Sequence, residues 1–374
     1  MKWAFWSAVA LIVYSYAGYL GWLWLWSRWR RLPVHSAPVE PLVSIVMVVR
    51  DEAQVLEAKI VNLLAMEYPE DRMELVIVSD GSTDRTETIL HEQARNPKVL
   101  TVLNQLRRGK AAGLNDGLRV AHGEIVIFTD ARQKIDKDAL RILLRNFADP
   151  QVGCVSGELM LGDPQAGEEG RGIGLYWRIE KKVRELESAS GSVVGATGAF
   201  YGVRRELLTE VPEGTILDDV YVPMQVARLG KRVIFEPAAR AWDTPDQGKN
   251  REFSRKVRTL SGNYQLVQMA PWLLTSQNPL RFRFISHKLL RLVVPFALIV
   301  IFVTSLWLAG PLYRTVWGLQ VAFYILSLAA FLRMPRSLLL ARAADAACTF
   351  VLLNTAALLA FGNFLAGRRV AWSR

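Results

Sequence analysis

Three short apolar runs, each followed by acidic residues, constrain the fold of this chain more than any other feature. The runs are Val43 to Val49, Leu75 to Val78 and Ile125 to Phe128. The acids that follow them are Asp51 with Glu52, Asp80, and Asp130. Runs of this length and composition are typical of strands buried on both faces of a parallel sheet. Ligands bind outside the carboxyl ends of such strands, so four carboxylates at one edge indicate a functional site.

Helical patterns separate these runs, at residues 53–64, 84–94 and 110–121. Alternating strands and helices predict a parallel sheet with right-handed crossovers. A further strand is expected at residues 152–159, followed by an amphipathic helix at residues 173–188. We therefore expect a single α/β domain over residues 42–270.

Residues 3–26 are almost entirely apolar and long enough to cross a bilayer of roughly 30 Å, so residues 1–31 are expected to be a membrane anchor. Five of the 12 tryptophans lie in this segment, as is typical of membrane interfaces. Lys2 alone precedes the segment, whereas Arg28, Arg30 and Arg31 follow it. Because positive residues stay on the cytoplasmic side, the α/β domain is expected to be cytoplasmic.

The C-terminal region is expected to return to the membrane. Residues 275–291 alternate cations with apolar residues, which predicts an interfacial amphipathic helix. Residues 292–374 contain about three further apolar segments, at 292–309, 312–332 and 345–366. Four spans from an outside start would place the tail outside, yet Arg368, Arg369 and Arg374 favour the inside. The side of the C-terminus therefore stays open.

The formal net charge of +11 suits an anionic partner, such as lipid headgroups, a phosphorylated substrate or nucleic acid. Nucleic acid is the weakest of these, because the α/β domain lacks basic aromatic stripes and its rim carboxylates would repel a phosphate backbone. Hydrophobic residues make up 51% of the chain, which favours one domain plus membrane segments. Only Cys154 and Cys348 are present, which excludes a disulfide framework and a thiolate zinc site.

Several motifs carry residues suited to chemistry, and each also has an ordinary structural interpretation. The stretch Asp80-Gly-Ser-Thr-Asp84 would form either a tight turn with a helix cap or part of the site. Asp130 offers hard carboxylate oxygens of the kind that Mg²⁺ and Mn²⁺ prefer. Lys110 lies in a basic loop before a helix, where it would meet a phosphate or remain a solvated charge.

Two further motifs lie later in the chain. Asp218 and Asp219 are adjacent acids, and adjacent acids shift each other's ionisation, which suits one of them to accept a proton from a hydroxyl. The local sequence alone favours an exposed acidic helix terminus instead. Arg255 and Arg258 would share one helical face and match a pyrophosphate, although basic helices near membranes commonly contact headgroups.

In order and spacing, these motifs resemble those of the membrane-integrated family 2 glycosyltransferases, which include the cellulose, chitin and hyaluronan synthases and bacterial relatives. The matching stretches are Val-Val-Arg-Asp51-Glu52, Val-Ser-Asp80-Gly-Ser-Thr-Asp84, Arg-Gly-Lys110, Phe-Thr-Asp130-Ala-Arg132, Gly195-Ala-Thr-Gly-Ala, Leu-Asp218-Asp219 and Arg255-Lys-Val-Arg258. The resemblance covers residues 42 to about 265. It implies an α/β fold of the glycosyltransferase A type, with a Rossmann-like mixed sheet, plus transmembrane α-helices.

The resemblance also implies an activity. This is inverting transfer of a sugar from a nucleotide-diphosphate donor, a UDP-sugar, to a saccharide or lipid-linked acceptor. Such transfer would serve polysaccharide or glycolipid synthesis at the bacterial inner (cytoplasmic) membrane, in contact with membrane lipids. Carried over by position, the implied roles are nucleoside contact by Asp51, Glu52 and Asp80; diphosphate contact by Lys110, Arg255 and Arg258; Mg²⁺ or Mn²⁺ binding by Asp130; proton acceptance by Asp219, next to Asp218; and acceptor contact by Gly195, Ala196, Thr197 and Gly198.

Two positions depart from the family pattern. Arg132 stands where the second acid of the metal-binding motif is expected, and Thr259 stands where a tryptophan follows the second arginine. We expect Arg132 to neutralise the diphosphate and reduce the share left to the metal. It also leaves open a catalytically degenerate membrane subunit that binds a nucleotide sugar. A basic membrane protein that binds anionic lipid or nucleic acid is a further alternative, and it predicts steep salt dependence.

Overall fold

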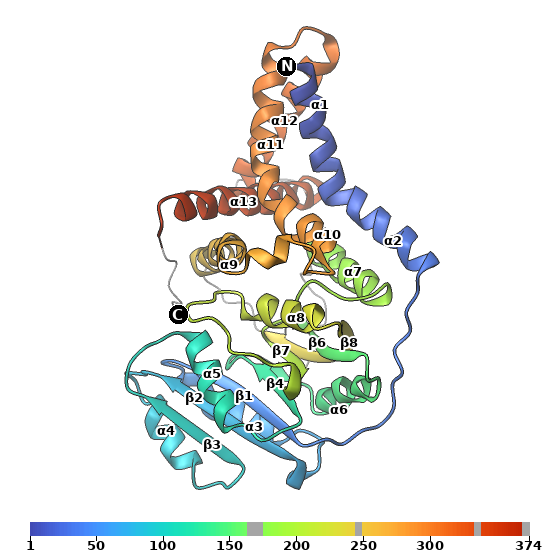
Figure 1. Cartoon of the computed structure of the whole chain (residues 1–374). Helices are drawn as coiled ribbons and strands as arrows, with labels where there is room; N and C mark the ends of the chain where they lie inside the picture. Colours follow the sequence, from blue (N-terminus) through green and yellow to red (C-terminus); the bar gives the residue numbers. More distant parts are fainter. Residues whose placement is uncertain (163–174, 244–248, 333–337, 369–374) are drawn as a thin grey trace.

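The computed structural model describes residues 1–162, 175–243, 249–332 and 338–368. Its centre is an eight-stranded mixed sheet in the order β3-β2-β1-β4-β7-β6-β8-β5. The strands are β1 (Val43–Val49), β2 (Met73–Asp80), β3 (Val99–Asn104), β4 (Ile125–Thr129), β5 (Lys134–Ile135), β6 (Val152–Leu161), β7 (Phe200–Arg204) and β8 (Arg232–Asp243). The predicted mixed α/β sheet is confirmed (Figure 1).

The first half of the sheet is parallel, as expected from the alternation of strands and helices. Strand β1 pairs in parallel with both β2 and β4, with Val49 opposite Ser79 and Val46 opposite Phe128. Every residue of β1 and β4 is buried, because helices cover both faces of the sheet. The carboxyl ends of β1, β2 and β4 therefore meet at one edge.

The helices divide between the two faces. One face packs against α3 (Ala53–Leu64), α4 (Thr86–Gln93) and α6 (Ala139–Leu144). The other face packs against α5 (Lys110–Val120), α8 (Asp218–Arg228), α9 (Lys249–Met269) and α10 (Arg281–Phe284). The helices predicted at 53–64 and 110–121 match α3 and α5 to within one residue.

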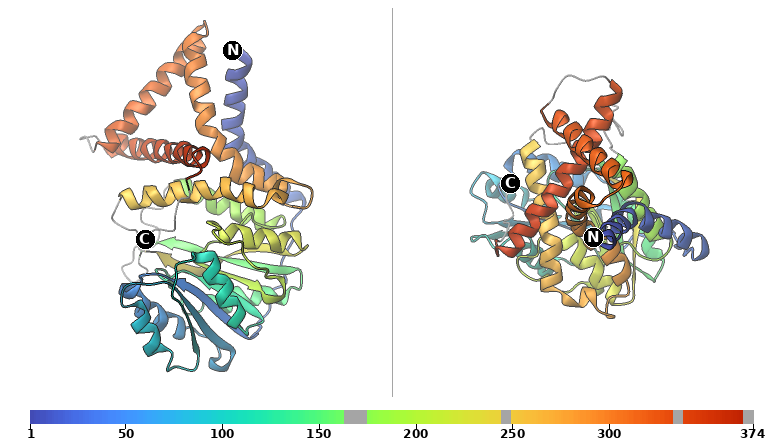
Figure 2. Two further views of the ribbon diagram at one scale, coloured as in Figure 1. Left: turned by 60° about the vertical axis from the view of Figure 1, so that its left-hand side comes forward. Right: turned by 90° about the horizontal axis from the view of Figure 1, so that it is seen from above.

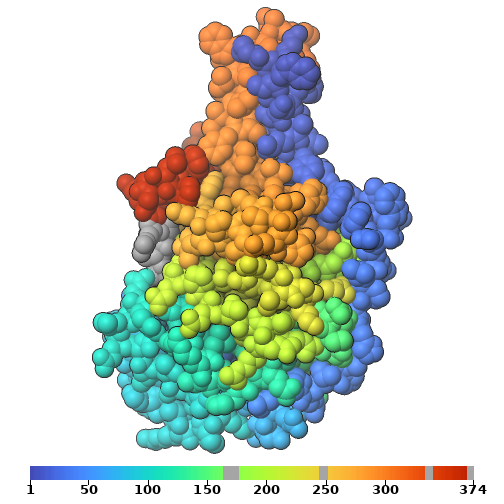
Figure 3. Space-filling model, in the orientation of Figure 1, coloured from blue at the N-terminus to red at the C-terminus, as the bar shows by residue number. Residues whose placement is uncertain are grey.

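Four helical segments are long and apolar enough to cross a membrane: Lys2–Trp29, Arg281–Trp307, Pro311–Phe331 and Leu340–Leu365. They contain α1 (Lys2–Val13), α2 (Tyr19–Trp29), α11 (Leu290–Trp307), α12 (Pro311–Phe331) and most of α13 (Leu338–Leu365). In Figure 2, α1, α11 and α12 stand away from the α/β domain, whereas α13 lies across their near ends. In Figure 3, the light-orange residues of α9 and α10 form a broad layer between the upright helices and the rest of the α/β domain.

An ion cluster joins α7 (Leu175–Ala189) to the apolar helices. The Tyr19 hydroxyl donates to Glu187 Oε1 at 2.6 Å, and His287 Nδ1 lies 2.9 Å from the same oxygen. Glu180 contacts His287 Nε2 at 2.7 Å and Arg291 Nη1 at 2.6 Å. Burial disfavours a charged Glu180, yet His287 and Arg291 hold the pKa of that carboxyl well below its usual range.

The cluster revises the interpretation of residues 275–291. Helix begins at Arg281 and continues through a π-helical turn into α11, so the cations lie at the start of one long helix. Arg283 is only 7% exposed and donates to the carbonyl oxygens of Glu187 and Ser192 at 2.6 and 2.9 Å. Two cations of this predicted interfacial helix, Arg283 and His287, contact the α/β domain, because α7 supplies Glu180 and Glu187 and the segment after α7 supplies the Ser192 carbonyl.

We expect Gly123→Ala to destabilise the protein, because a Cβ at Gly123 would lie 2.7 Å from the Val43 carbonyl carbon. Backbone cannot give way as a flexible side chain does, so the expected loss is about 1–3 kcal/mol of unfolding free energy. Gly318→Ala in α12 is the matched control, because a Cβ there has nothing within 4 Å. The thermal unfolding midpoints of the two purified variants make the comparison. Equal midpoints would contradict the close approach of β1 to the turn before β4.

Candidate active site

The carboxyl edge of the parallel strands carries two interlocked turns. Asp51 follows β1 with φ +52°, a left-handed conformation that is uncommon for a residue other than glycine. Its Oδ1 accepts the Thr83 amide at 2.7 Å and the Thr83 hydroxyl at 3.1 Å. In return, Asp84 Oδ2 accepts the amide of Ala53 at 3.1 Å, and the Glu52 amide donates to Thr86 Oγ1 at 2.9 Å. The turn after β1 and the turn after β2 are thus a single rigid unit.

Asp80, at the end of β2, is fully buried and organises the basic loop. Its Oδ1 accepts the amide of Arg108 at 2.7 Å, and its Oδ2 accepts the amide of Gly109 at 2.9 Å. Gly109 has φ +94°, which lets the loop turn directly into the first residue of α5, Lys110. The structure therefore places Asp80 behind Lys110, and its predicted contact with a nucleoside stays a prediction.

Lys110 is the centre of a group of carboxylates drawn from two other parts of the chain. Its Nζ lies 2.9 Å from Asp130 Oδ1 and 3.3 Å from Asp218 Oδ2. Burial disfavours a charged Lys110, but Asp130 and Asp218 outweigh that effect and raise its pKa above the usual value. A Cβ at Gly198 would lie 3.5 Å from both Asp130 Oδ2 and Asp219 Oδ2. Residues predicted separately from four motifs therefore surround one small space.

Asp218 and Asp219 begin α8, where the helix N-terminus favours negative charge. Asp218 is buried, and its Oδ2 accepts no hydrogen bond although it is ion-paired with Lys110. Burial and the charge of Asp218 raise the pKa of Asp219 to about 6, against a smaller opposing effect of Lys110. The sequence alone favoured an exposed acidic terminus, whereas the structure turns the pair toward Lys110.

The glycine-rich loop before β7 closes the space from the other side. Ala196 donates its amide to the backbone oxygen of Asp219 at 2.7 Å, and the Thr197 amide donates to Ser156 Oγ at 3.0 Å. A Cβ at Gly195 would lie 3.2 Å from Val220 Cγ2, so the loop approaches the start of α8 closely. The absence of side chains at Gly195 and Gly198 therefore lets the loop lie close to α8 and to the carboxylates of the site.

Arg132 has a partner that the sequence did not indicate. Its Nη2 lies 2.7 Å from Asp243 Oδ2 and 3.0 Å from Asp243 Oδ1. Arg255 Nη1, at the start of α9, lies 3.8 Å from the same Oδ2. Two arginines that were predicted independently thus share one buried acid at the end of β8. Arg258 lies one turn further along α9.

Asp243 escaped the sequence analysis because Glu236 and Pro237 interrupt the apolar run of β8, which hides a strand of 12 residues. Lys59 was missed as well. It is only 3% exposed, and its Nζ donates to Thr129 Oγ1 at 3.0 Å and to the Gln133 carbonyl at 2.6 Å. Burial lowers its pKa to about 7, against the opposing charge of Asp130. A lysine among Leu56, Ile60 and Leu63 on the apolar face of α3 was the available signal.

Asp130 is the only carboxylate of the metal-binding motif, because Arg132 occupies the second position. Among the described residues, no three His, Cys, Asp or Glu side chains lie together as a metal site. A magnesium or manganese ion commonly takes one or two carboxylates and completes its shell with substrate phosphates and water. Asp130, whose side chain is 41% exposed, fits that kind of shared site.

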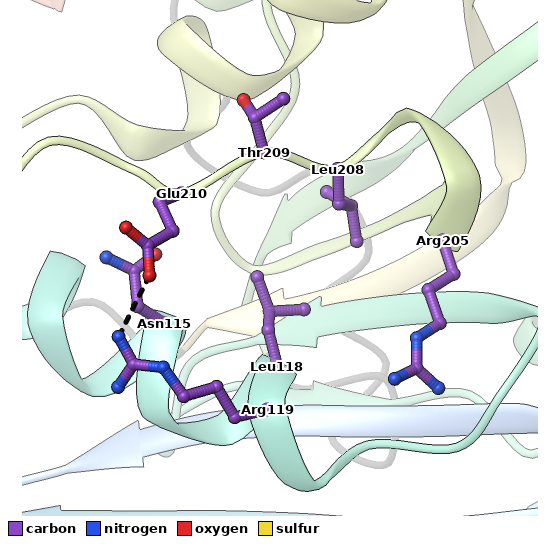
Figure 4. Close-up of a pocket in the computed structure, with 7 residues that line it drawn as sticks. All are labelled: Asn115, Leu118, Arg119, Arg205, Leu208, Thr209 and Glu210. Atoms are coloured by element: carbon purple, nitrogen blue, oxygen red, sulfur yellow. Dashed lines mark hydrogen bonds and ion pairs between the residues drawn. The ribbon is translucent and has the colours of Figure 1, made fainter.

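A shallow hollow lies at the far end of α5 from Lys110. Its lining comes from α5 and from the segment after β7 (Figure 4), namely Asn115, Leu118, Arg119, Arg205, Leu208, Thr209 and Glu210. Arg119 Nη2 pairs with Glu210 Oε1 across it at 2.9 Å. None of the predicted site residues lines this hollow.

The comparisons with known proteins bear on the family and the fold. Residues 44–211 match the family model of glycosyl transferase family 2. The chain carries a family 2 glycosyltransferase domain. Poly-beta-1,6-N-acetyl-D-glucosamine synthases of Staphylococcus aureus (strain COL) and Staphylococcus epidermidis are similar, at 25% identity over 234 and 239 residues. These matches cover 60% and 62% of this chain, but only 55% and 56% of the synthases. The chain thus spans about half the length of these relatives.

A solved structure shares the fold over almost the whole chain. The mannosyltransferase PcManGT from Pyrobaculum calidifontis, in complex with GDP-Man and Mn²⁺, superposes with a TM-score of 0.72 at 24% identity. The match covers 96% of this chain and 97% of that one. The predicted fold of the glycosyltransferase A type with added apolar helices is confirmed.

The matched stretch of the family 2 domain ends at residue 211. It includes the strand-end acids, Lys110, Asp130, Arg132 and the loop at 195–198. Asp219, Arg255 and Arg258 lie beyond it, so the contacts of Asp219 and Arg255 come from the structure alone, and the role of Arg258 stays a prediction. Asp219 reaches Gly198 and Lys110, and Arg255 reaches Asp243.

We expect Asp80→Asn to loosen the basic loop, because an asparagine keeps only one of the two oxygens that accept the amides of Arg108 and Gly109. Loss of hydrogen bonds to a buried charged acceptor costs about 1–3 kcal/mol each. Limited trypsin digestion after Arg107 and Arg108 is the measurement, and cleavage there should be faster in the variant. Asp71→Asn, at an exposed acid, is the control and should digest like the parent. If Asp80→Asn were cleaved after Arg107 and Arg108 as slowly as the parent, Asp80 would not be needed to hold the loop.

Proposed function

We propose that this family 2 glycosyltransferase transfers a sugar, with inversion, from a nucleotide-diphosphate donor to a saccharide or lipid-linked acceptor. A UDP-sugar is the proposed donor, and polysaccharide or glycolipid synthesis the proposed context. The similarity to the staphylococcal polysaccharide synthases supports this class of product. The single observation that carries the proposal is the approach of Asp130, Asp219 and Lys110 to one point beside Gly198.

Asp219 is the proposed proton acceptor. Its pKa of about 6 leaves it ionised near neutral pH, yet basic enough to take a proton from a hydroxyl as that hydroxyl attacks. The acceptor oxygen forms a bond to the anomeric carbon while the bond from that carbon to the diphosphate oxygen breaks. The electron pair of the broken bond leaves with the diphosphate, and attack from the opposite face inverts the configuration.

Cations are proposed to receive the leaving diphosphate. Lys110 stands at the N-terminus of α5, where backbone amides and the helix dipole also favour phosphate. Arg132, Arg255 and Arg258 supply guanidinium groups, whose paired N–H donors match phosphate oxygens. Asp51, Glu52 and Asp80 are proposed to form the nucleoside side of the site. Asp130 would hold Mg²⁺ or Mn²⁺, and such an ion neutralises charge that develops on the diphosphate.

The membrane setting is also a proposal. The domain would lie on the cytoplasmic face of a bacterial inner membrane, because Arg28, Arg30 and Arg31 follow the first apolar segment. The loop from Gly195 to Gly198 would form the acceptor side, since it lies against Asp219. Membrane lipids would surround the apolar helices, and a lipid-linked acceptor would reach the site from the same surface.

We expect Asp219→Asn to lower kcat by about 10²–10⁴-fold, because general-base catalysis contributes rates of that order. For the parent enzyme, kcat/KM should fall about tenfold per pH unit below pH 6, since a protonated Asp219 cannot accept a proton. Release of UDP from UDP-sugars, measured with an acceptor across a pH series, tests the kcat of the variant and the pH dependence of the parent. Glu210→Gln, at an exposed acid away from the site, is the control. Parent-like turnover by Asp219→Asn would end this assignment.

Asp130→Ala and Arg132→Ala are expected to act differently. Asp130→Ala should abolish transfer and any dependence on Mn²⁺ or Mg²⁺. Arg132→Ala should raise the donor KM and leave transfer detectable, because Arg255 remains beside Asp243. A screen of UDP-sugars and GDP-mannose, with and without Mn²⁺, measures the donor KM and the dependence of transfer on the metal. Tight donor binding by the parent without transfer to any acceptor would favour a degenerate binding subunit instead.

A further inference from the structure

Helix α13 has the length and composition of a membrane span but a different placement. It is 28 residues long, or roughly 42 Å at the usual rise per residue. The views of Figure 2 agree that it lies lengthwise beneath the upright helices α11 and α12, seen from the side and from above. Its contacts include α9, a helix of the α/β domain. A helix that crossed a bilayer parallel to α11 would move away from α9 within a few turns.

Ring contacts along α13 place its middle and its end at the same level. The ring of Phe350 lies 5.5 Å from that of Tyr16 and 5.6 Å from that of Phe323. Eleven residues later, Phe361 lies 5.0 Å from Phe296, near the start of α11, and 5.8 Å from Tyr264 of α9. Helix α13 thus crosses from one upright helix to another and then reaches the α/β domain.

The far end of the upright helices lies elsewhere. Phe5 of α1 packs 5.0 Å from Tyr313, which follows the turn between α11 and α12. Lys2 and that turn therefore mark one end of the upright group, and the α/β domain marks the other (Figure 1). Both ends of α13 lie on the domain side, because α12 returns to it and α13 stays there.

The exposed side chains of α13 suit the boundary between headgroups and acyl chains. Leu340, Leu359 and Leu365 are 54%, 48% and 68% exposed. Arg342 lies in the first turns and Arg368 just past the end, and both are exposed, as cations that meet anionic headgroups would be. Exposed Asp345 and Thr349 would be costly at the centre of a bilayer, but not at its surface.

We propose that α13 is not a span but an in-plane helix that rests on the lipid surface at the level of α9. Three segments then cross the bilayer, and both ends of α13 stay on the side of the α/β domain. This placement puts Arg368 on the side that the positive-inside rule favours. It also holds α9, which carries Arg255 and Arg258, against the membrane surface. The proposal does not rest on the transfer reaction.

Depth-dependent fluorescence quenching tests the placement. The full-length protein, with Cys348→Ala, is reconstituted in phosphatidylcholine and phosphatidylglycerol liposomes; Cys154 is fully buried. Single cysteines at Leu340, Thr349 and Leu359 carry a fluorophore, and lipids with bromine at shallow or deep acyl positions quench it. The matched control is Leu312, Leu319 and Leu328 in α12, which are 51%, 66% and 55% exposed.

In α12, Leu319 should be quenched best by deep bromines and Leu312 and Leu328 by shallow ones. In α13, all three positions should prefer shallow bromines. A protease-cleavable tag after Arg374 should be accessible from the same side as the α/β domain. If Thr349 is quenched as deeply as Leu319, or if the tag is accessible from the opposite side, α13 is a span and the proposal is wrong.

Discussion

The contact of Lys110 with Asp130 and Asp218 is the interaction on which the site depends. These residues come from the start of α5, the end of β4 and the start of α8, so one ammonium group joins three elements. Without it, adjacent carboxylates at the rim would repel each other in a partly buried space. Asp80 fixes the loop that delivers Lys110, and Gly198 leaves room beside it. The catalytic proposal follows from this balance of charge.

Much of the fold could be predicted because its signals are local. The apolar runs that became β1, β2 and β4 are buried on both faces, and α3 begins and ends where its pattern does. The strand-end acids were found for the same reason. The interruption of β8 hid Asp243, since a strand containing Glu236 and Pro237 lacks the apolar run that identifies a buried strand.

Partnership between distant residues could not be predicted in the same way. Arg283 and His287 have the sequence of an interfacial helix, and only the position of α7 gives them Glu187 and Glu180 as partners. Because these contacts are buried, the first apolar helix, α7 and the start of α11 are held as one body. The α/β domain is therefore fixed to the apolar helices by directional hydrogen bonds as well as by apolar packing.

Asp243 has a consequence for the time that a product stays bound. A guanidinium that already has a carboxylate partner binds a diphosphate by exchanging partners, not by losing water alone. The exchange weakens binding, but it keeps Arg132 and Arg255 in place between turnovers, which saves ordering entropy. In the proposed reaction, the same acid would compete with the nucleoside diphosphate that remains after transfer. Asp243 would thus favour departure of the spent nucleotide and leave the two arginines in place for the next donor.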